Sequence, residues 1–359
     1  MNENRNMKGN WMSIILAIII LGIIIFLHEL GHFMTAKYYK MPVMEFAIGM
    51  GPKIFTKKIG ETDYSIRMLP LGGFVNIAGM QPEENPENEI PGGFYTKPAF
   101  SRFVVLIAGV MMNFLTALMA IFILISITGV VPSKYIEPVI GMIQESSRAK
   151  SFLQSGDRVT EINGVKVSNW NDLQEEILKV NGTEKKYNDE DISVKISRNG
   201  KEISGNVKLT YNKDAESYIL GVQAQQSKVS LLKKMEISVY SFAEYFKMMV
   251  QGLKMLITGK VSAREITGPV GLPKFVGEAY KSGGGLALIN IFIILSINIG
   301  LMNLLPIPAL DGGRLLFVIP EFVGIKINKK IEEKIHMVGM ILLLILMVFI
   351  IFNDVTKYF

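Results

Sequence analysis

The main pattern along the chain is a series of apolar runs separated by polar sequence. A helix needs about 20 apolar residues, within a range of about 17–25, to cross the hydrocarbon core of a bilayer. Three runs reach that length with few or no charges, and a fourth is slightly short but almost uninterrupted. We therefore predict four transmembrane helices, in the runs Trp11 to Leu27, Phe103 to Val131, Leu286 to Leu305 and Met337 to Phe352.

The connection between the first two runs alternates between apolar and polar residues instead. Tyr64, Ile66 and Met68 alternate with Ser65 and Arg67, and Gly-Pro and Gly-Gly pairs interrupt the pattern. Alternation of this kind is typical of strands, and the glycine and proline pairs mark turns. We predict a β-hairpin at the membrane surface, followed by a polar, proline-rich loop over residues 81–98.

Between the second and third runs, residues 137–229 have the composition of a soluble domain. The stretch SGDRVTEINGVKVSNWNDLQEEILK predicts a strand, an Asn-Gly hairpin turn, a second strand and an amphipathic helix. A second Asn-Gly hairpin follows at Asn199 and Gly200. This order and the first stretch resemble a PDZ domain, a small β-barrel that captures peptides as an added strand. A generic small β domain is the alternative.

The segment after this domain places apolar residues near helical spacing over residues 230–260. We expect an amphipathic helix that lies against the membrane or against the other spans. A tight loop, ITGPVGLP, and the stretch KSGGGL then lead into the third run.

The composition agrees with a protein that lies partly in a bilayer and partly in water. The chain has 359 residues, of which 49% are apolar and 19% are charged. It contains no cysteine, which excludes disulfides and thiolate metal ligands. The net charge is +6, but the basic residues are dispersed and mostly lie beside the apolar runs. A lipid bilayer, and no nucleic acid, is therefore the predicted partner.

Lysine and arginine near the ends of the runs predict the orientation in the membrane. They gather in the connection between the first and second runs and in that between the third and fourth, whereas the two ends of the chain carry few. Loops rich in lysine and arginine stay on the cytoplasmic side. We therefore place both connections in the cytoplasm and the PDZ-like domain outside, in a multi-pass protein of the bacterial inner (cytoplasmic) membrane.

The first run ends in the pattern HELGH, in which His28 and His32 flank Glu29. Residues four apart lie on one face of a helix, so both imidazoles can reach one metal ion. In an HExxH helix the histidines bind zinc and the glutamate acts as general base. A soluble helix can carry this pattern by chance, but ionisable groups at membrane depth are expensive and favour a functional site. We predict Zn²⁺ at His28 and His32, with Glu29 as the catalytic base.

A catalytic zinc site needs a third protein ligand, and the candidate is Asp311 in NLLPIPALDGGR. Two prolines break the helix there, which a membrane protein tolerates only in its interior. An aspartate at that depth needs a neutralising partner, and zinc provides one; a pair with Arg314 is the alternative. The predicted topology brings Asp311 to the depth of HELGH, whereas His336 lies at the margin of the fourth run.

Taken together, the motifs resemble the bacterial site-2 protease family, intramembrane zinc metalloproteases that regulate sigma factors. HELGH, LPLGGFVNIAG, AGVMMNF, the PDZ-like insert, ITGPVGLP and NLLPIPALDGGR occur in the order of that family and cover nearly the whole chain. The resemblance implies that His28, His32 and Asp311 bind zinc and that Glu29 is the catalytic acid and base. It also implies that Asn303 holds the substrate strand or the developing oxyanion. An amide that satisfies the broken helix backbone is the alternative for Asn303.

One position departs from the family pattern. In AGVMMN, Val110 stands where the family often has proline, so the second span can enter its helix differently. Asn113 of the same motif is retained, and we derive no consequence for the zinc site from either residue. The interval between the second and third spans has room for one PDZ domain.

The predicted fold class is a polytopic α-helical membrane protein with about four transmembrane helices, a membrane-surface β-hairpin region and one inserted PDZ-like β domain. Seven segments make up this organisation: 11–37 (first transmembrane helix, with HELGH), 38–99 (cytoplasmic or membrane-associated β-hairpin and loop), 100–131 (second transmembrane helix), 137–229 (extracytoplasmic PDZ-like domain), 230–284 (amphipathic helix and loop), 285–319 (third transmembrane helix, with NLLPIPALDGG) and 335–353 (fourth transmembrane helix).

The predicted function is that of a zinc-dependent intramembrane endopeptidase. Its expected reaction is regulated intramembrane proteolysis of single-span membrane proteins such as anti-sigma factors, with remnant signal peptides as a further substrate class. Two other classes stay open: a membrane transporter with a His/Glu/Asp proton relay, and a non-catalytic membrane scaffold that displays a PDZ domain. A transporter would more often show repeated halves, and a scaffold would have no use for HELGH paired with Asp311.

Overall fold

The computed structural model describes residues 2–80, 90–181, 191–213, 216–225, 229–260, 268–325 and 327–358. Contacts between residues divide the chain into two compact units, which we call the membrane unit and the insert. The membrane unit consists of Met1–Leu124 and Phe242–Phe359, and the insert of Ile125–Ser241. Parts of the predicted segments 38–99, 137–229 and 230–284 lie outside the described residues, among them half of the predicted loop over 81–98.

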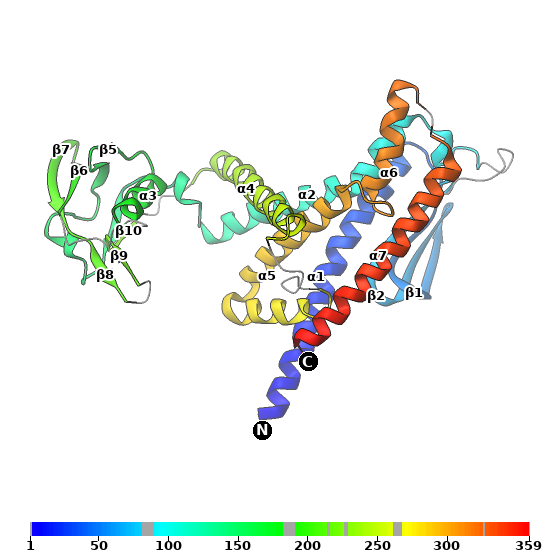
Figure 1. Ribbon diagram of the computed structural model, residues 1–359, viewed down its shortest axis with the longest axis horizontal. Coiled ribbons are helices and arrows are strands. Elements are labelled where there is room, and N and C mark those ends of the chain that lie inside the picture. The colour runs from blue at the N-terminus through cyan, green and yellow to red at the C-terminus, as the bar shows by residue number, and fades with distance from the viewer. Residues whose placement is uncertain are drawn as a thin grey trace. The chain divides into compact units, whose positions relative to one another are not determined.

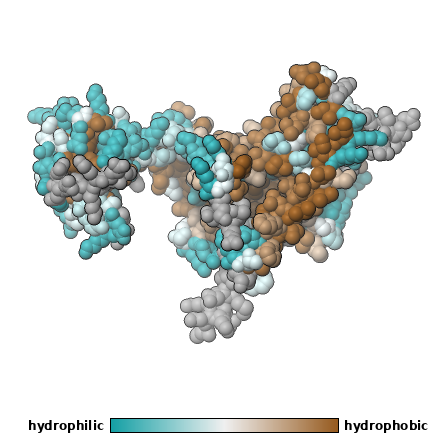
Figure 2. Space-filling view, viewed as in Figure 1, coloured by the Kyte–Doolittle hydropathy of each residue, from teal (hydrophilic) through white to brown (hydrophobic). Residues whose placement is uncertain are grey.

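Four helices of the described chain are long and apolar enough to cross a membrane. They are α1 (Asn2–Tyr38), α2 (Ala99–Thr128), α5 (Leu272–Leu304) and α7 (Lys329–Tyr358), as Figure 1 shows. These helices carry many exposed large apolar side chains, which give the brown surface of the membrane unit in Figure 2. Apolar surface on this scale is suited to lipid and not to water. The four predicted spans are confirmed.

α5 begins earlier than the sequence indicated. We expected a loop up to residue 284, but the helix begins at Leu272, with a proline in its first turn. Gly284 interrupts the helix with a φ of 59° and a ψ of −143°, which glycine adopts at low cost because it has no Cβ atom. α5 therefore consists of two helical segments that point in different directions (Figure 1).

After α5 ends at Leu304, the chain folds back against the end of this helix in a tight loop. It then enters the short helix α6 (Asp311–Val318) and the 3₁₀ turn η6 (Ile319–Val323). The two prolines in this loop lack the backbone N–H that a continuous helix needs. A side-chain carbon on Gly312 would overlap the carbonyl oxygens of Leu304 and Leu305, so a glycine is required for this close return. The loop sets Asp311 at the first position of α6.

Strands β1 (Val43–Ile59) and β2 (Thr62–Ile77) form the predicted β-hairpin. The first part of β1 pairs with two separate segments of β2, so that Ala47 lies opposite Phe74 and also opposite Ser65. The segment 73–77 therefore forms an edge of this sheet, and no other strand in the described chain pairs with it.

Aromatic and apolar side chains hold the membrane unit together. Phe26 and Phe33 of α1 contact the ring of Phe46 in β1, with centroid distances of 5.7 and 5.0 Å. The predicted amphipathic helix is present as α4 (Leu231–Ile257), and Tyr245 in it donates a hydrogen bond of 2.7 Å to Asn290 of α5. A buried cluster joins α1 to α5 and consists of Ala17, Ile20, Ile24, Val276 and Ile291.

The described residues of the insert form a small β unit with the helix α3 (Trp170–Asn181). The end of α2 and the beginning of α4 also belong to the insert. Its strands are β3 (Ile140–Ile143), β4 (Arg158–Ile162), β5 (Val165–Lys166), β6 (Ile192–Arg198), β7 (Lys201–Val207), β8 (Thr210–Asn212), β9 (Ser217–Ile219) and β10 (Val222–Ala224). They form the sheets β5-β4-β6-β7, β10-β3 and β8-β9.

Both predicted Asn-Gly turns of the insert are present. Asn163 and Asn199 have φ values of 49° and 52°, and the glycine after each also has a positive φ, as two-residue hairpin turns require. One hydrophobic core lies between the sheets and α3 and contains the side chain of Trp170. The predicted fold class is thus confirmed in its four apolar helices, its hairpin region and its inserted β unit.

Candidate metal centre

α1 brings the two histidines of HELGH to a single point. His28 and His32 are one helical turn apart, and only 6% and 7% of their surfaces are exposed. Their rings lie nearly perpendicular with centroids 4.8 Å apart, and the two Nε2 atoms are 3.2 Å apart. The regular helix of α1 thus places two potential metal-binding nitrogens side by side.

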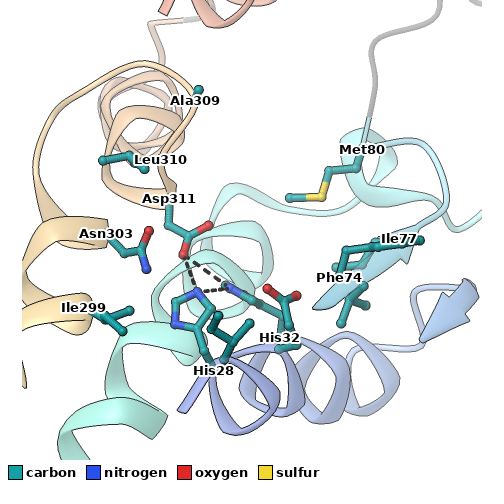
Figure 3. Close-up of a pocket in the computed structure, with 13 residues that line it drawn as sticks. His28, His32, Phe74, Ile77, Met80, Ile299, Asn303, Ala309, Leu310 and Asp311 are labelled. Carbon is teal, nitrogen blue, oxygen red and sulfur yellow. Dashed lines mark hydrogen bonds and ion pairs between the residues drawn. The ribbon is translucent and has the colours of Figure 1, made fainter. Parts of the chain in front are cut away.

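Asp311 reaches the same point from the other end of the chain. Its Oδ2 atom lies 3.0 Å from His28 Nε2 and 3.3 Å from His32 Nε2 (Figure 3). Arg314, the alternative partner of Asp311 in the sequence, instead donates a hydrogen bond to the carbonyl oxygen of Met80. The structure therefore brings together the three predicted ligands, whose potential ligand atoms all lie within 4.8 Å of one another.

The arrangement of these atoms fits a zinc ion. His32 Nδ1 lies 2.8 Å from the carbonyl oxygen of Val105, and only a protonated nitrogen can donate to a carbonyl. In neutral His32 the lone pair is therefore on Nε2, where it faces His28 Nε2 and the Asp311 carboxylate. Two imidazoles and a carboxylate are a common protein ligand set of catalytic zinc, which keeps a fourth position for water.

Two residues of α2 that the sequence analysis did not assign to the site also contact it. A side-chain carbon on Gly109 would overlap His32 Nε2 and would lie 2.8 Å from His28 Nε2, so the glycine leaves this space open. The side-chain amide of Asn113 lies 3.4 Å from His28 Nδ1. Their spacing of four residues within AGVMMNF, which puts both on one face of a helix, is the signal that could have indicated them.

A cavity of about 280 Å³ opens beside the three ligands. Glu29 and Val75 both line it. Asn303 of α5 lies on one side of the cavity, and Phe74 of the sheet edge 73–77 lies on the other (Figure 3). The cavity thus combines a carboxylate, an amide and an open strand edge around the predicted ligands.

His336 is not part of the cluster, which agrees with the sequence analysis. Its Nδ1 atom accepts a hydrogen bond of 2.9 Å from the backbone N–H of Ala309. Ala309 has a φ of 76°, an unfavourable value for a residue with a side chain, and it precedes Asp311 by two positions. α7 therefore contributes a contact to the loop that carries Asp311.

Comparisons with known proteins agree with this geometry. The model of Peptidase family M50 matches residues 16–346. A relative from Fusobacterium nucleatum, provisionally named a zinc metalloprotease, is 43% identical over 97% of this chain and 100% of its own length. Zinc metalloprotease RasP of Geobacillus kaustophilus is 32% identical over 97% of this chain and 98% of that protein. Regulator of sigma-W protease RasP of Bacillus subtilis is 29% identical over 97% and 99%.

Among solved structures, the PDZ domain of an SdrC-like protein from Listeria innocua is similar to part of the chain. It is 21% identical, covers 26% of this chain and 97% of that domain, and has a TM-score of 0.22. The family match, in contrast, begins within α1, includes α2 and α5 completely and ends within α7. The chain therefore belongs to Peptidase family M50, the site-2 protease family, and is a zinc metalloprotease.

Proposed function

We propose that this protein is an intramembrane endopeptidase that cuts single-span membrane proteins. The observation that carries the proposal is the convergence of His28 and His32 with Asp311, beside Glu29, on helices that are apolar enough to lie in a bilayer. We assign zinc binding to the two histidines and Asp311. A ligand set that joins α1 to α6 would also hold these two helices together.

We assign Glu29 as the general base and acid of the reaction. Bound zinc supplies a Lewis acid and lowers the pKa of water at its open position. The Glu29 carboxylate lines the same cavity, so it can accept a proton from the attacking water. The same group can then return that proton to the nitrogen of the leaving amine.

The substrate would bind in an extended conformation between Asn303 and the sheet edge 73–77. A helical segment keeps its carbonyl groups in hydrogen bonds, so it must unwind before water can attack. An exposed strand edge offers backbone groups that pair with an unwound segment, and Phe74 of this edge lines the cavity. We assign to Asn303, which lines the opposite side, the role of positioning the substrate or the developing oxyanion.

The proposed substrates are single-span proteins of the anti-sigma-factor type, with remnant signal peptides as a second group. The name of the Bacillus subtilis relative, a protease that regulates sigma-W, supports this class. We also propose the inner membrane of a bacterium as the location, with the site toward the cytoplasm and the insert outside. The concentration of lysine and arginine in the two connections supports this orientation.

Glu29→Gln tests the proposal in purified protein reconstituted into lipid vesicles with a single-span substrate. We expect wild-type zinc content, because Glu29 is not one of the proposed ligands, and cleavage slower by at least about 100-fold. Glu278→Gln, a change of an exposed acid on α5, is the matched control and should cleave normally. Normal cleavage by Glu29→Gln, or the absence of zinc from the wild type, would contradict the proposal.

A further inference from the structure

The side chain of Asn113 lies at His28, on the side of the ring that faces away from Asp311. Asn113 is fully buried on α2, and its amide nitrogen Nδ2 is 3.4 Å from His28 Nδ1. Its second polar atom, Oδ1, is buried and has no hydrogen-bond partner in the part of the chain that the structure describes. Because buried polar side-chain atoms are nearly always hydrogen-bonded, we expect Asn113 Oδ1 to accept a hydrogen bond here.

His28 can bind a metal only through a nitrogen that carries a lone pair. Its Nε2 atom is the one that faces Asp311 Oδ2, at 3.0 Å, and His32 Nε2, at 3.2 Å. A neutral imidazole has one protonated nitrogen. A lone pair on Nε2 therefore requires the proton on Nδ1, and this buried N–H donor points at Asn113.

The amide of Asn113 can satisfy that donor only with its oxygen, because an amide nitrogen donates and does not accept. A half-turn about the Cβ–Cγ bond exchanges the oxygen and the nitrogen of an asparagine amide. The other histidine already has the equivalent contact, since His32 Nδ1 donates to the carbonyl oxygen of Val105 at 2.8 Å. With Oδ1 of Asn113 turned toward His28, both rings have an acceptor for Nδ1–H and direct Nε2 to the metal.

We propose that Asn113 is a positioning residue for the zinc ligand His28. Its Oδ1 accepts the hydrogen bond from His28 Nδ1–H and holds this ring in the tautomer and orientation that zinc binding needs. The inference rests on the zinc site assigned above and extends it to the second span. Partners of this kind typically change metal affinity by about 10–100-fold when they are removed.

The backbone at Asn113 is held firmly enough for this role. Ser296 of α5 donates a hydrogen bond of 2.9 Å to the Asn113 carbonyl oxygen, and Thr116 donates one of 3.0 Å to the same atom. Ser296 is itself fully buried. The first, second and third spans thus meet at the level of Asn113. The two hydrogen bonds fix its backbone, so its side-chain amide stays next to His28.

The test is the zinc affinity of the full-length purified protein, measured against a competing chelator. Asn113→Leu, which has a similar size and no acceptor, should bind zinc about 10–100-fold more weakly than the wild type. Asn113→Asp keeps an oxygen acceptor and should restore most of the affinity, as in the carboxylate–histidine–zinc arrangement. Ser126→Ala, which removes a hydroxyl from an exposed position of the same helix and leaves the amide in place, is the matched control and should keep wild-type affinity.

The thermal midpoint of each variant without and with zinc separates metal binding from folding. Zinc should raise the thermal midpoint of Asn113→Leu less than that of the wild type. Asn113→Ala, a second variant without an acceptor and without added bulk, should behave in the same way. Cobalt bound in place of zinc should give visible absorption bands. We expect the spectra of Asn113→Leu and Asn113→Ala to differ from the wild-type spectrum, and that of Asn113→Asp to resemble it.

Three results would overturn the inference. Wild-type zinc affinity in Asn113→Leu or Asn113→Ala would remove Asn113 from its role and leave the site itself intact. A loss of affinity in Asn113→Asp as large as in Asn113→Leu, with both proteins folded, would show that an oxygen acceptor is not what His28 needs. Failure of the wild type to bind zinc would overturn the proposed ligand set, and this inference with it.

Discussion

A side-chain carbon on Gly109 of α2 would overlap the Nε2 atom of His32 on α1. The same carbon would lie 2.8 Å from His28 Nε2. The backbone of α2 at Gly109 is therefore one wall of the space in which the two imidazoles meet. A glycine, the residue without a side chain, leaves that space open.

Gly109→Ala should therefore abolish or strongly weaken zinc binding. Overpacking a close contact typically costs about 1–3 kcal/mol, which corresponds to about tenfold in affinity for each 1.4 kcal/mol. The zinc content after dialysis against a chelator would measure the effect. Gly252→Ala on α4 is the control, because an added carbon there meets nothing within 4 Å. Full zinc retention in Gly109→Ala would mean that α2 does not form this wall.

His336→Leu should weaken zinc binding without removing a ligand. The change leaves the N–H of Ala309 without its acceptor, which costs about 1 kcal/mol and loosens the loop that carries Asp311. We expect a several-fold lower zinc affinity and faster hydrogen exchange at Ala309. His336→Asn should retain most of the affinity, because its side-chain oxygen can take the place of Nδ1. Met337→Leu, at the neighbouring exposed position, is the control. If His336→Leu, His336→Asn and Met337→Leu all bound zinc with wild-type affinity, a role for α7 in placing this loop would be excluded.

Asp354→Ala should destabilise the junction between α7 and the start of α5. The fully buried Asp354 carboxylate accepts hydrogen bonds from the backbone N–H groups of Gly268, Val270 and Gly271, at 3.0, 3.1 and 2.9 Å. Leaving a buried donor unpaired costs about 1–3 kcal/mol.

A lower thermal midpoint in detergent, with faster hydrogen exchange over 268–271, would measure the effect of Asp354→Ala. Thr356→Val changes an exposed hydroxyl that bonds within its own helix, and it should behave like the wild type. An unchanged midpoint in Asp354→Ala would show that the three N–H groups find other acceptors.

The insert should lose stability in acid through Asp157. Burial alone would raise the pKa of the Asp157 carboxyl, but hydrogen bonds from Arg198 and from the Gln154 N–H outweigh burial and hold the pKa below its ordinary value. A group with a lowered pKa in the folded state stabilises the fold fully above its unfolded pKa of about 3.9. That contribution to stability is lost as the pH falls below the unfolded pKa and through the lower pKa that Asp157 has in the folded protein.

Asp157→Asn should remove this acid dependence and lower the stability at neutral pH by about 2 kcal/mol, the typical value of a hydrogen bond to a charged group. The fluorescence of Trp170, which is buried in the core of the insert, reports unfolding in a Trp11→Phe background. Glu137→Gln changes an exposed acid of the insert and should keep the wild-type acid response. The same acid response in Asp157→Asn would assign the effect to other groups.

Local patterns in the sequence predicted the four apolar helices and the hairpin turns of this fold. The apolar runs predicted the four spans, because soluble segments rarely carry an almost unbroken apolar run of bilayer length. The two Asn-Gly pairs predicted hairpin turns that the structure contains, since these residues tolerate a positive φ. HELGH and Asp311 could be joined in advance because an acid inside a membrane needs a partner.

The sequence by itself thus determined which segments are apolar enough to enter a membrane and which residues are candidates for the metal centre, because length, periodicity and charge act within a single segment. Only the tertiary structure decided that the face of α2 with Gly109 and Asn113 lies on the two histidines, and that the sheet edge 73–77 borders the cavity. The break of α5 at Gly284 was equally hidden, since glycine permits both helix and turn. Contacts of this kind depend on how closely two helices approach and which faces they present, and that is settled by the packing of all the spans together.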